Sequence, residues 1–180
     1  MSSIFRTLAA NERGAAVIEM ALIAPVLALG VIGIVDMSNA YSKKLALEQG
    51  AQRAIEKIMN TTENATVEST LATEAVCQVN GTTTSGGVTT CNASPITTSN
   101  VTVTWRLDCT TTGGTVTTQT TTSSATYDAF TCANTSDTKA GYVQVTVTDK
   151  YSPLFPIHFA SFNTGDSTYH LSATAGMRTY

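Results

Sequence analysis

Two residues near the N-terminus, Gly14 and Glu19, have a spacing that could support chemistry at a membrane. They open a run that reads G-A-A-V-I-E-M-A-L-I-A-P-V-L-A-L-G-V-I-G-I-V, in which Glu19 is the single charged residue. The 21 residues Ala15–Val35 are long enough to cross a bilayer as a helix, which needs about 20 apolar residues. A carboxylate near the centre of such a helix costs about 3 kcal/mol, and less near its edge. Glu19 is therefore either a charge that reaches the interface or one that pairs with a partner inside the membrane.

Four cysteines are the second group of reactive residues, and all of them follow the apolar run. They are Cys77, Cys91, Cys109 and Cys132. No C-x-x-C pair occurs, so neither a zinc site nor a redox motif is indicated. In an exported segment two disulfides are expected, against the alternative of four buried free thiols. Of the three possible connectivities, 77–91 with 109–132 is favoured because each bond closes a loop rich in glycine and threonine, which stabilises by about 3 kcal/mol in the chain-entropy model.

The sequence gives no support for catalysis or for nucleic-acid binding. The patterns G-x-S-x-G, G-x-x-x-x-G-K-[ST] and H-E-x-x-H do not occur. The 10 basic and 13 acidic residues give a formal net charge of -3, without a basic patch. We therefore predict a protein that is not an enzyme, with no cofactor, no metal and no nucleic-acid partner.

The residues before Gly14 lack the order of an ordinary secretory signal. Arg6, Glu12 and Arg13 stand directly before the apolar run, and no A-x-A-like cleavage site follows it. An uncleaved anchor stays open as an alternative. Basic residues on both sides of the span leave its orientation ambiguous by the positive-inside rule. The cysteines and the Thr-rich remainder favour an N-terminus inside and a C-terminal domain outside.

The Gly–Glu spacing resembles the signal of type IV pilin-like proteins, in which glutamate is the fifth residue after a cleaved glycine. Residues 13–25 read R-G-A-A-V-I-E-M-A-L-I-A-P, and G-I-V-D follows at 33–36, where Asp36 marks the outer interface. This run is similar to that of TadE-like minor pseudopilins of the tight adherence pilus. The resemblance is strong over roughly the first 55 residues and weak over the last 40, where Y-S-P-L-F-P and A-x-A-x-M-R occur. Met20 departs from the Phe or Tyr frequent in pilins, without changing the Gly–Glu spacing.

The resemblance implies a minor pseudopilin that a prepilin peptidase cuts between Gly14 and Ala15, and that is needed for assembly of an adhesive pilus. It implies that Glu19 docks on the first amine of a neighbouring subunit. The expected partners are the prepilin peptidase, other pilins and pseudopilins, the inner-membrane assembly platform and membrane lipid. The expected location is the bacterial inner membrane, single-pass, with the N-terminus cytoplasmic and the C-terminal domain periplasmic, and with incorporation into the extracellular pilus left open. The alternative function is a singly anchored extracytoplasmic binding or adhesion module with an uncleaved helix.

Hydrophobic periodicity predicts one helix over residues 15–59, with an amphipathic second half. Pro25 removes one backbone hydrogen bond and is expected to kink or loosen this helix. The sheet of the same domain is favoured over a separate partner as the cover of the amphipathic half. The residues assigned to its apolar face are Ala40, Tyr41, Leu45, Leu47, Ala51, Ala54, Ile55 and Ile58.

The remainder of the chain predicts a Thr-rich β region. A short helix is expected over 65–79, strands over 101–107, 142–148 and 168–174, and an exposed hairpin over 107–121 that turns at Gly113-Gly114. The predicted fold class is α+β and pilin-like, a long N-terminal helix packed on a small antiparallel sheet of about four strands. The predicted domains are a leader over 1–14, a transmembrane helix over 15–36, its extracytoplasmic continuation over 37–60, and an extracytoplasmic β domain with disulfides over 61–180.

Overall fold

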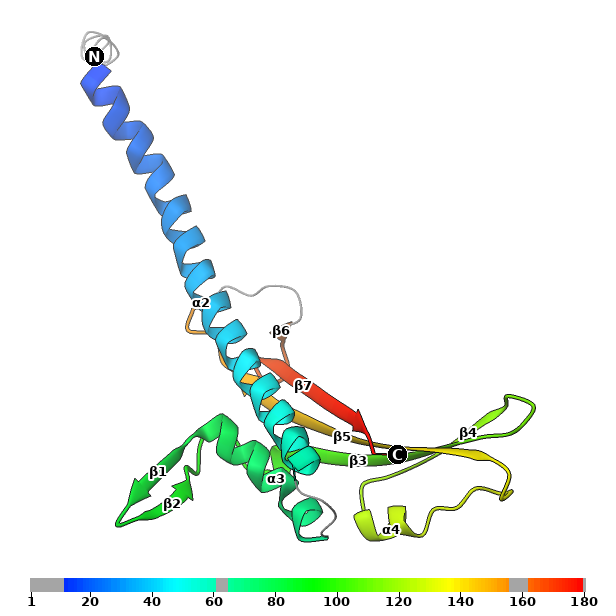
Figure 1. The fold of residues 1–180 in the computed structure, drawn as a ribbon. Coiled ribbons are helices and arrows are strands. Elements are labelled where there is room, and N and C mark those ends of the chain that lie inside the picture. Colours follow the sequence, from blue (N-terminus) through cyan, green and yellow to red (C-terminus); the bar gives the residue numbers. More distant parts are fainter. Residues whose placement is uncertain (1–11, 61–64, 156–161, 180) are drawn as a thin grey trace. The chain divides into compact units, whose positions relative to one another are not determined.

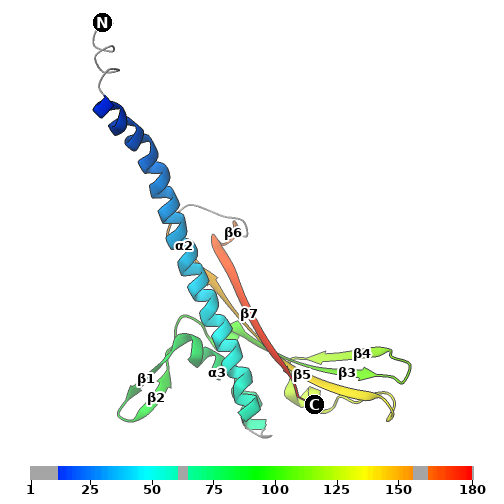
Figure 2. The ribbon, with the colours of Figure 1, turned by 45° about the horizontal axis from the view of Figure 1, so that its top comes forward.

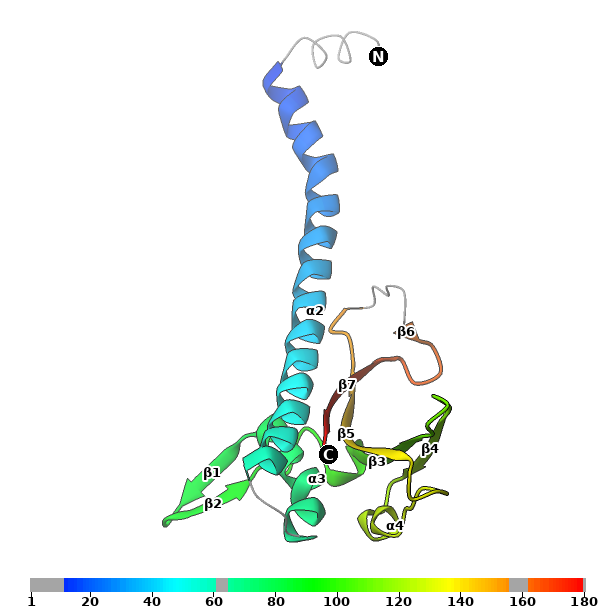
Figure 3. The ribbon, with the colours of Figure 1, turned by 45° about the vertical axis from the view of Figure 1, so that its right-hand side comes forward.

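The computed structural model describes residues 12–60, 65–155 and 162–179 (Figure 1). Figures 2 and 3 show the same elements from two other sides. The chain divides into two compact units, residues 1–41 with 153–160, and residues 42–152 with 161–180. In chain order the elements are α2 (Glu12–Asn60), α3 (Ala65–Asn80), β1 (Thr82–Ser85), β2 (Val88–Cys91), the short 3-10 helix η1 (Thr98–Asn100), β3 (Val101–Thr110), β4 (Val116–Thr121), α4 (Ser124–Asp128), β5 (Thr138–Tyr151), β6 (Phe162–Asn163) and β7 (Thr168–Arg178).

Helix α2 has 49 residues, as the periodicity predicted, and its N-terminal part belongs to the first unit. Every side chain from Ala16 to Val31 is exposed, and all of them are apolar except Glu19. Such a surface is stable only when lipid or other apolar helices cover it. Within the described part of the chain, α2 is the one helix long and apolar enough to cross a membrane by length and composition.

The second unit has one hydrophobic core, formed where the C-terminal part of α2 and helix α3 meet the sheet. Its fully packed residues are Leu47, Ala51, Ala54 and Ile55 of α2, Leu71, Ala75 and Val76 of α3, Ile96 before η1, and Trp105, Val143, Val145, Val147 and Ala173 of the sheet. The α2 members recur at intervals of four, three and one residues, which is one stripe of a helix. This confirms the prediction that the amphipathic half of the long helix packs on the sheet of its own domain.

The predicted apolar face of α2 was wrong at two positions. Tyr41 is 63% exposed and Leu45 is 39% exposed. Leu45 lies two residues from Leu47, which is about 200° around a helix of 3.6 residues per turn, so it points away from the stripe that meets the sheet. The side chain of Ile58, which was also assigned to this face, lies outside the described residues.

The main sheet is antiparallel, in the order β4-β3-β5-β7-β6. Its centre is the pairing of β5 with β7, in register from Tyr142↔Arg178 to Tyr151↔Tyr169. Both strands are longer than predicted, because pairing with the neighbouring strands continues beyond the predicted alternation, through 138–141 and 149–151 of β5 and through 175–178 of β7. The count of about four strands missed the two-residue β6 and the separate two-stranded sheet of β1 and β2.

The predicted hairpin of β3 and β4 is present, but its strands differ in burial. Strand β4 is an edge strand and is mostly exposed, as expected. Strand β3 pairs with β5 on its other side, so Leu107 and Cys109 are buried rather than exposed. Strand β5 ends at Tyr151, two residues before Pro153, which could not donate a hydrogen bond to a central strand.

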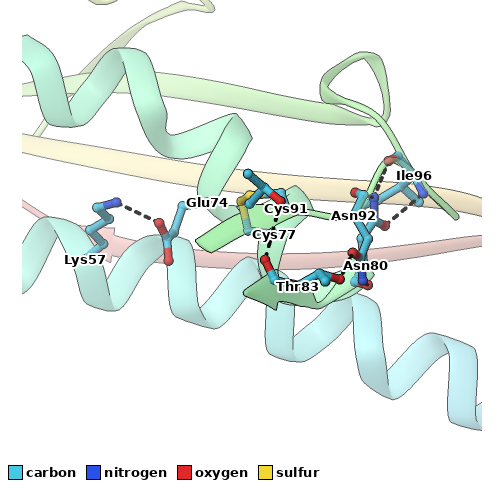
Figure 4. The surroundings of a disulfide bond; sticks show 9 residues. Lys57, Glu74, Cys77, Asn80, Thr83, Cys91, Asn92 and Ile96 are labelled. Atoms are coloured by element: carbon cyan, nitrogen blue, oxygen red, sulfur yellow. Dashed lines mark hydrogen bonds and ion pairs between the residues drawn. A yellow bond between two sulfur atoms is a disulfide. The ribbon is translucent and has the colours of Figure 1, made fainter. Parts of the chain in front are cut away.

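The cysteines pair as the sequence favoured. Cys77 of α3 bonds Cys91 of β2, with a Cα–Cα distance of 4.8 Å, and Cys109 of β3 bonds Cys132 beyond α4, at 5.6 Å. Figure 4 shows the first bond beside Asn80, the last residue of α3. The Asn80 amide donates to the carbonyl oxygens of Asn92 and Ile96, at 2.8 and 2.7 Å. The end of α3 is therefore held both covalently and by its own side chain.

Gly50 is a point of close approach between α2 and α3. A Cβ at this position would collide with the side chain of Val79 and lie 3.1 Å from the carbonyl oxygen of Ala75. Although alanine is normally better than glycine in a helix by about 1 kcal/mol, overpacking of this kind costs about 1–3 kcal/mol.

We expect Gly50→Ala to lower the free energy of unfolding of the detergent-solubilised chain by about 1–2 kcal/mol, as measured by chemical denaturation. Gly113→Ala is the matched control, because the nearest atom to its Cβ would be 3.9 Å away. That control should change stability by less than about 0.5 kcal/mol. Equal stability of Gly50→Ala and the control would contradict the close approach of α2 and α3 at Gly50.

A charged cluster ties the ends of β5 and β7 together. Asp166 Oδ2 lies 2.8 Å from Lys150 Nζ and 2.6 Å from His170 Nε2, and Thr168 donates to Asp166 Oδ1 at 2.8 Å. The hydrogen bond from Lys150, then those from His170 and Thr168, hold the pKa of the Asp166 carboxyl well below its usual value. A depressed carboxyl pKa contributes stability above the unfolded-state value, which is lost as pH falls toward the folded-state value.

We expect the thermal midpoint of the wild-type domain to fall as pH decreases below about 4, with part of that fall due to Asp166. Asp166→Asn should flatten the dependence in this range, and Lys150→Gln should flatten it partly because the first donor is gone. Thermal melts at a series of acid pH values measure this. If the thermal midpoint of Asp166→Asn fell with decreasing pH as steeply as that of the wild type, Asp166 would not contribute to the loss of stability in acid.

Candidate assembly site on the N-terminal helix

The two residues of the predicted processing junction, Gly14 and Ala15, lie in the first turn of α2, which begins at Glu12. Most of the predicted leader, residues 1–11, lies outside the described residues. The junction is thus the start of the helix, and the chain on its C-terminal side is continuously helical through the apolar run.

Glu19 lies on the exposed apolar surface of α2, one turn beyond Ala15. Its neighbours in the chain, Ile18 and Met20, are 61% and 65% exposed. Leu22 and Ile23, three and four residues later, are adjacent to it on the helix surface and are also exposed. Among the side chains that the structure describes, none forms an ion pair with Glu19. The site is therefore a single carboxylate in an apolar surface. A cationic partner for it would have to come from outside the described side chains.

The geometry of a helix directs that carboxylate toward the junction. Four residues separate Ala15 from Glu19, which is a rise of about 6 Å. Side chains of a helix tilt toward its N-terminus, so the Glu19 carboxylate is carried back toward the level of residue 15. A parallel helix packed nearly in register would place its own residue 15 within reach of this carboxylate.

Pro25 lies inside α2, and the helix continues on both sides of it. Because proline has no N–H, the carbonyl of Ala21 lacks its helical donor. Neighbouring helices or local adjustment can satisfy such a carbonyl within a membrane. The kink at Pro25 itself stays a prediction.

Near the end of the apolar run, the first unit has a shallow apolar hollow of about 830 Å³. A Cβ at Gly30 would meet nothing within 4 Å, so another helix can approach the backbone closely there. The residues around the hollow are Leu29, Gly30, Gly33, Ile34, Met37, Ser38 and Tyr41.

Asp36 follows this hollow, and the structure gives it a contact that the sequence did not predict. The backbone N–H of Leu154 donates to Asp36 Oδ1 at 3.0 Å, across 118 positions of the chain. Asp36 is 5% exposed. The sequence marked Asp36 as the outer end of the span and the Y-S-P-L-F-P segment as part of a resemblance, but no local pattern could pair them.

An exposed apolar helix at the N-terminus, followed by an α+β unit with two disulfides, fits a membrane-anchored pilus protein. Residues 14–55 match the family model described as TadE-like protein. This region is TadE-like, which confirms the resemblance seen in the sequence and indicates a role in the tight adherence pilus system. TadE-like pilus proteins are structural proteins, and their role implies contacts with other pilus components. No curated protein and no solved structure matches the chain.

The match begins at Gly14, the first residue of the predicted junction, and ends at Ile55, the last buried residue among the α2 side chains that the structure describes. It therefore spans the exposed apolar surface with Glu19 and Pro25, Asp36, and the stripe that packs on the sheet. The β region lies outside the match.

Proposed function

We propose that the chain is a minor pseudopilin that a prepilin peptidase cuts between Gly14 and Ala15, and that it is needed for assembly of an adhesive tight adherence pilus. The observation that carries the proposal is Glu19, a carboxylate on an exposed apolar helix surface, one turn after the junction. The TadE-like match of residues 14–55 supports it. The same proposal names two specific partners, the prepilin peptidase and the inner-membrane assembly platform.

In this proposal the chain inserts with its N-terminus in the cytoplasm and the β region in the periplasm. Cleavage leaves a mature chain of 166 residues, 180 minus 14. It also creates an α-amine at Ala15, a group that can carry a positive charge and that the precursor lacks at this position. The peptidase thus produces the positive charge that the apolar surface of α2 lacks.

The amine and the carboxylate then serve as a docking pair between subunits. Each charge alone is expensive in lipid, and the two together are tolerable because they neutralise and hydrogen-bond each other. The rise of about 6 Å between Ala15 and Glu19, with the side chain tilted toward the N-terminus, favours a neighbour that packs nearly in register. An uncleaved chain has no amine at this level, so docking depends on processing.

Glu19→Val should remove docking without impairing insertion. Loss of the carboxylate relieves an insertion cost of about 3 kcal/mol or less, so the variant should resist alkaline extraction from membranes as well as the wild type does. Glu19→Gln, of the same shape but neutral, should also fail in assembly. Pili are counted by electron microscopy and by immunoblot of the sheared fraction.

Met20→Val is the matched control for that experiment, because Met20 is exposed on the same helix and carries no charge. It should assemble normally. Normal piliation of both Glu19 variants would make Glu19 a tolerated interfacial charge and end the docking mechanism.

Gly14→Leu should block cleavage, because the bulk of leucine replaces a glycine next to the scissile bond. We expect the variant to accumulate at the mass of the full chain in the membrane fraction, with no pili. Gly30→Leu, a glycine of the same helix far from the junction, should be processed as the wild type is. A processed Gly14→Leu chain would place the cut elsewhere, and an unprocessed wild type would favour a singly anchored binding or adhesion module.

A further inference from the structure

The contact between Asp36 and Leu154 joins the end of the apolar run to a segment far along the chain. Both residues belong to the first unit, which comprises residues 1–41 and 153–160. The Leu154 amide lies 3.0 Å from Asp36 Oδ1. The Asp36 carboxylate is hidden, whereas Val35 and Met37 on either side of it are 45% and 53% exposed. The Leu154 amide of the segment Pro153–Phe155 is therefore one of the groups that shield this carboxylate, while the helix surface on either side of it stays open.

The length of the helix determines the depth of this contact in the membrane. From Ala15 to Asp36 the rise is about 32 Å at 1.5 Å per residue, which equals the hydrocarbon thickness of about 30 Å. A helix that spans with Ala15 at one boundary therefore places Asp36 at the other. Since the Leu154 amide is hydrogen-bonded to Asp36, it lies at the same boundary.

At that boundary the segment presents apolar side chains outward. Leu154 is 65% exposed and Phe155 is 37% exposed. In water this exposure is unfavourable, whereas the headgroup region of a bilayer accepts such side chains to a depth of about 5–10 Å. Pro153, Leu154 and Phe155 carry no titratable side chain, so no charge of these three residues has to leave water.

Two of the three backbone nitrogens of the segment need no water as a hydrogen-bond acceptor. Pro153 has no N–H to satisfy, and the N–H of Leu154 is satisfied by Asp36. An unsatisfied backbone donor is costly at membrane depth. The carboxylate thus has two effects, since it gives Leu154 its acceptor and is itself removed from the lipid-facing surface.

We infer that Pro153–Phe155 is a second membrane contact, in which Leu154 and Phe155 insert into the lipid interface at the Asp36 end of the span. The inference rests on the membrane insertion of α2 in the proposed function and goes beyond it. Lipid is the occupant because the segment is hydrogen-bonded to Asp36, whose chain neighbours Val35 and Met37 belong to the exposed surface of α2, at the depth where the hydrocarbon ends. The contact fixes the depth of α2, and so keeps Glu19 near the opposite boundary.

The test places the photoreactive residue p-benzoyl-phenylalanine at one of three positions of the full chain in cells. Leu154 is the position in question. Leu27, 61% exposed on α2, reports whether the helix is in lipid, and Val88, 64% exposed on β2 of the second unit, is the matched apolar control. After irradiation, adducts with phospholipid and with protein are distinguished by mass spectrometry.

Phospholipid adducts at positions 27 and 154, with none at 88, are the expected result. An adduct at 27 but not at 154, or a protein adduct in place of lipid at 154, overturns the inference and leaves the spanning helix intact. Absence of lipid at 27 overturns the membrane insertion and the inference with it.

A variant pair tests the role of the carboxylate. Asp36→Ala removes the acceptor of the Leu154 amide and should reduce the lipid adduct at 154 while the adduct at 27 stays unchanged. Asp36→Asn keeps an oxygen acceptor of the same shape and should retain the adduct at 154. An undiminished adduct at 154 in Asp36→Ala would contradict the positioning of the segment by Asp36.

Discussion

The structure depends on one constraint, a carboxylate held on an apolar helix surface. From Ala16 to Val31 every side chain of α2 is exposed, and Glu19 is the one charge among them. Neither water nor lipid accommodates both parts of this surface, because water disfavours the apolar side chains and lipid disfavours the carboxylate. In the proposed function, the conflict is resolved by a cation that the precursor lacks, the α-amine that cleavage after Gly14 creates one helical turn before Glu19.

The C-terminal part of α2 meets a different requirement, since it lies in a folded unit with its own core. There the stripe from Leu47 to Ile55 packs on α3 and the sheet, and Gly50 permits the close approach of α3. Two disulfides hold elements whose polar, Thr-rich sequences bury little: the β1–β2 hairpin through Cys91 and the loop beyond α4 through Cys132. This unit keeps a defined structure with few charges and a small core.

Local patterns of the sequence sufficed for the long helix and the main strands. The apolar run and the Gly14–Glu19 spacing are contiguous in sequence, and Val143, Val145 and Val147 alternate with polar residues as a half-buried strand does. The disulfide pairing also followed from local loops. The exposure of Tyr41 and Leu45 did not, because apolar composition does not say which of several helix faces meets the sheet.

The contact of Asp36 with Leu154 was beyond any sequence pattern. The two residues are 118 positions apart. Leu154 contributes its backbone N–H, a group that every residue except proline has, so its side chain gives no sign of the contact. The ends of β5 and β7 were missed for a related reason, since the residues added to each strand lie beyond the predicted alternation and are held by cross-strand pairing. Long-range backbone contacts of this kind depend on the completed fold.

The central claim is that processing creates the docking partner of Glu19, and the N-terminus of the wild-type protein tests it most directly. Intact-mass and N-terminal peptide analysis of the chain purified from membranes and from sheared pili is the measurement. The account predicts a chain of 166 residues that begins at Ala15 with a free or methylated amine. A chain that retains residues 1–14 in assembled pili would contradict it.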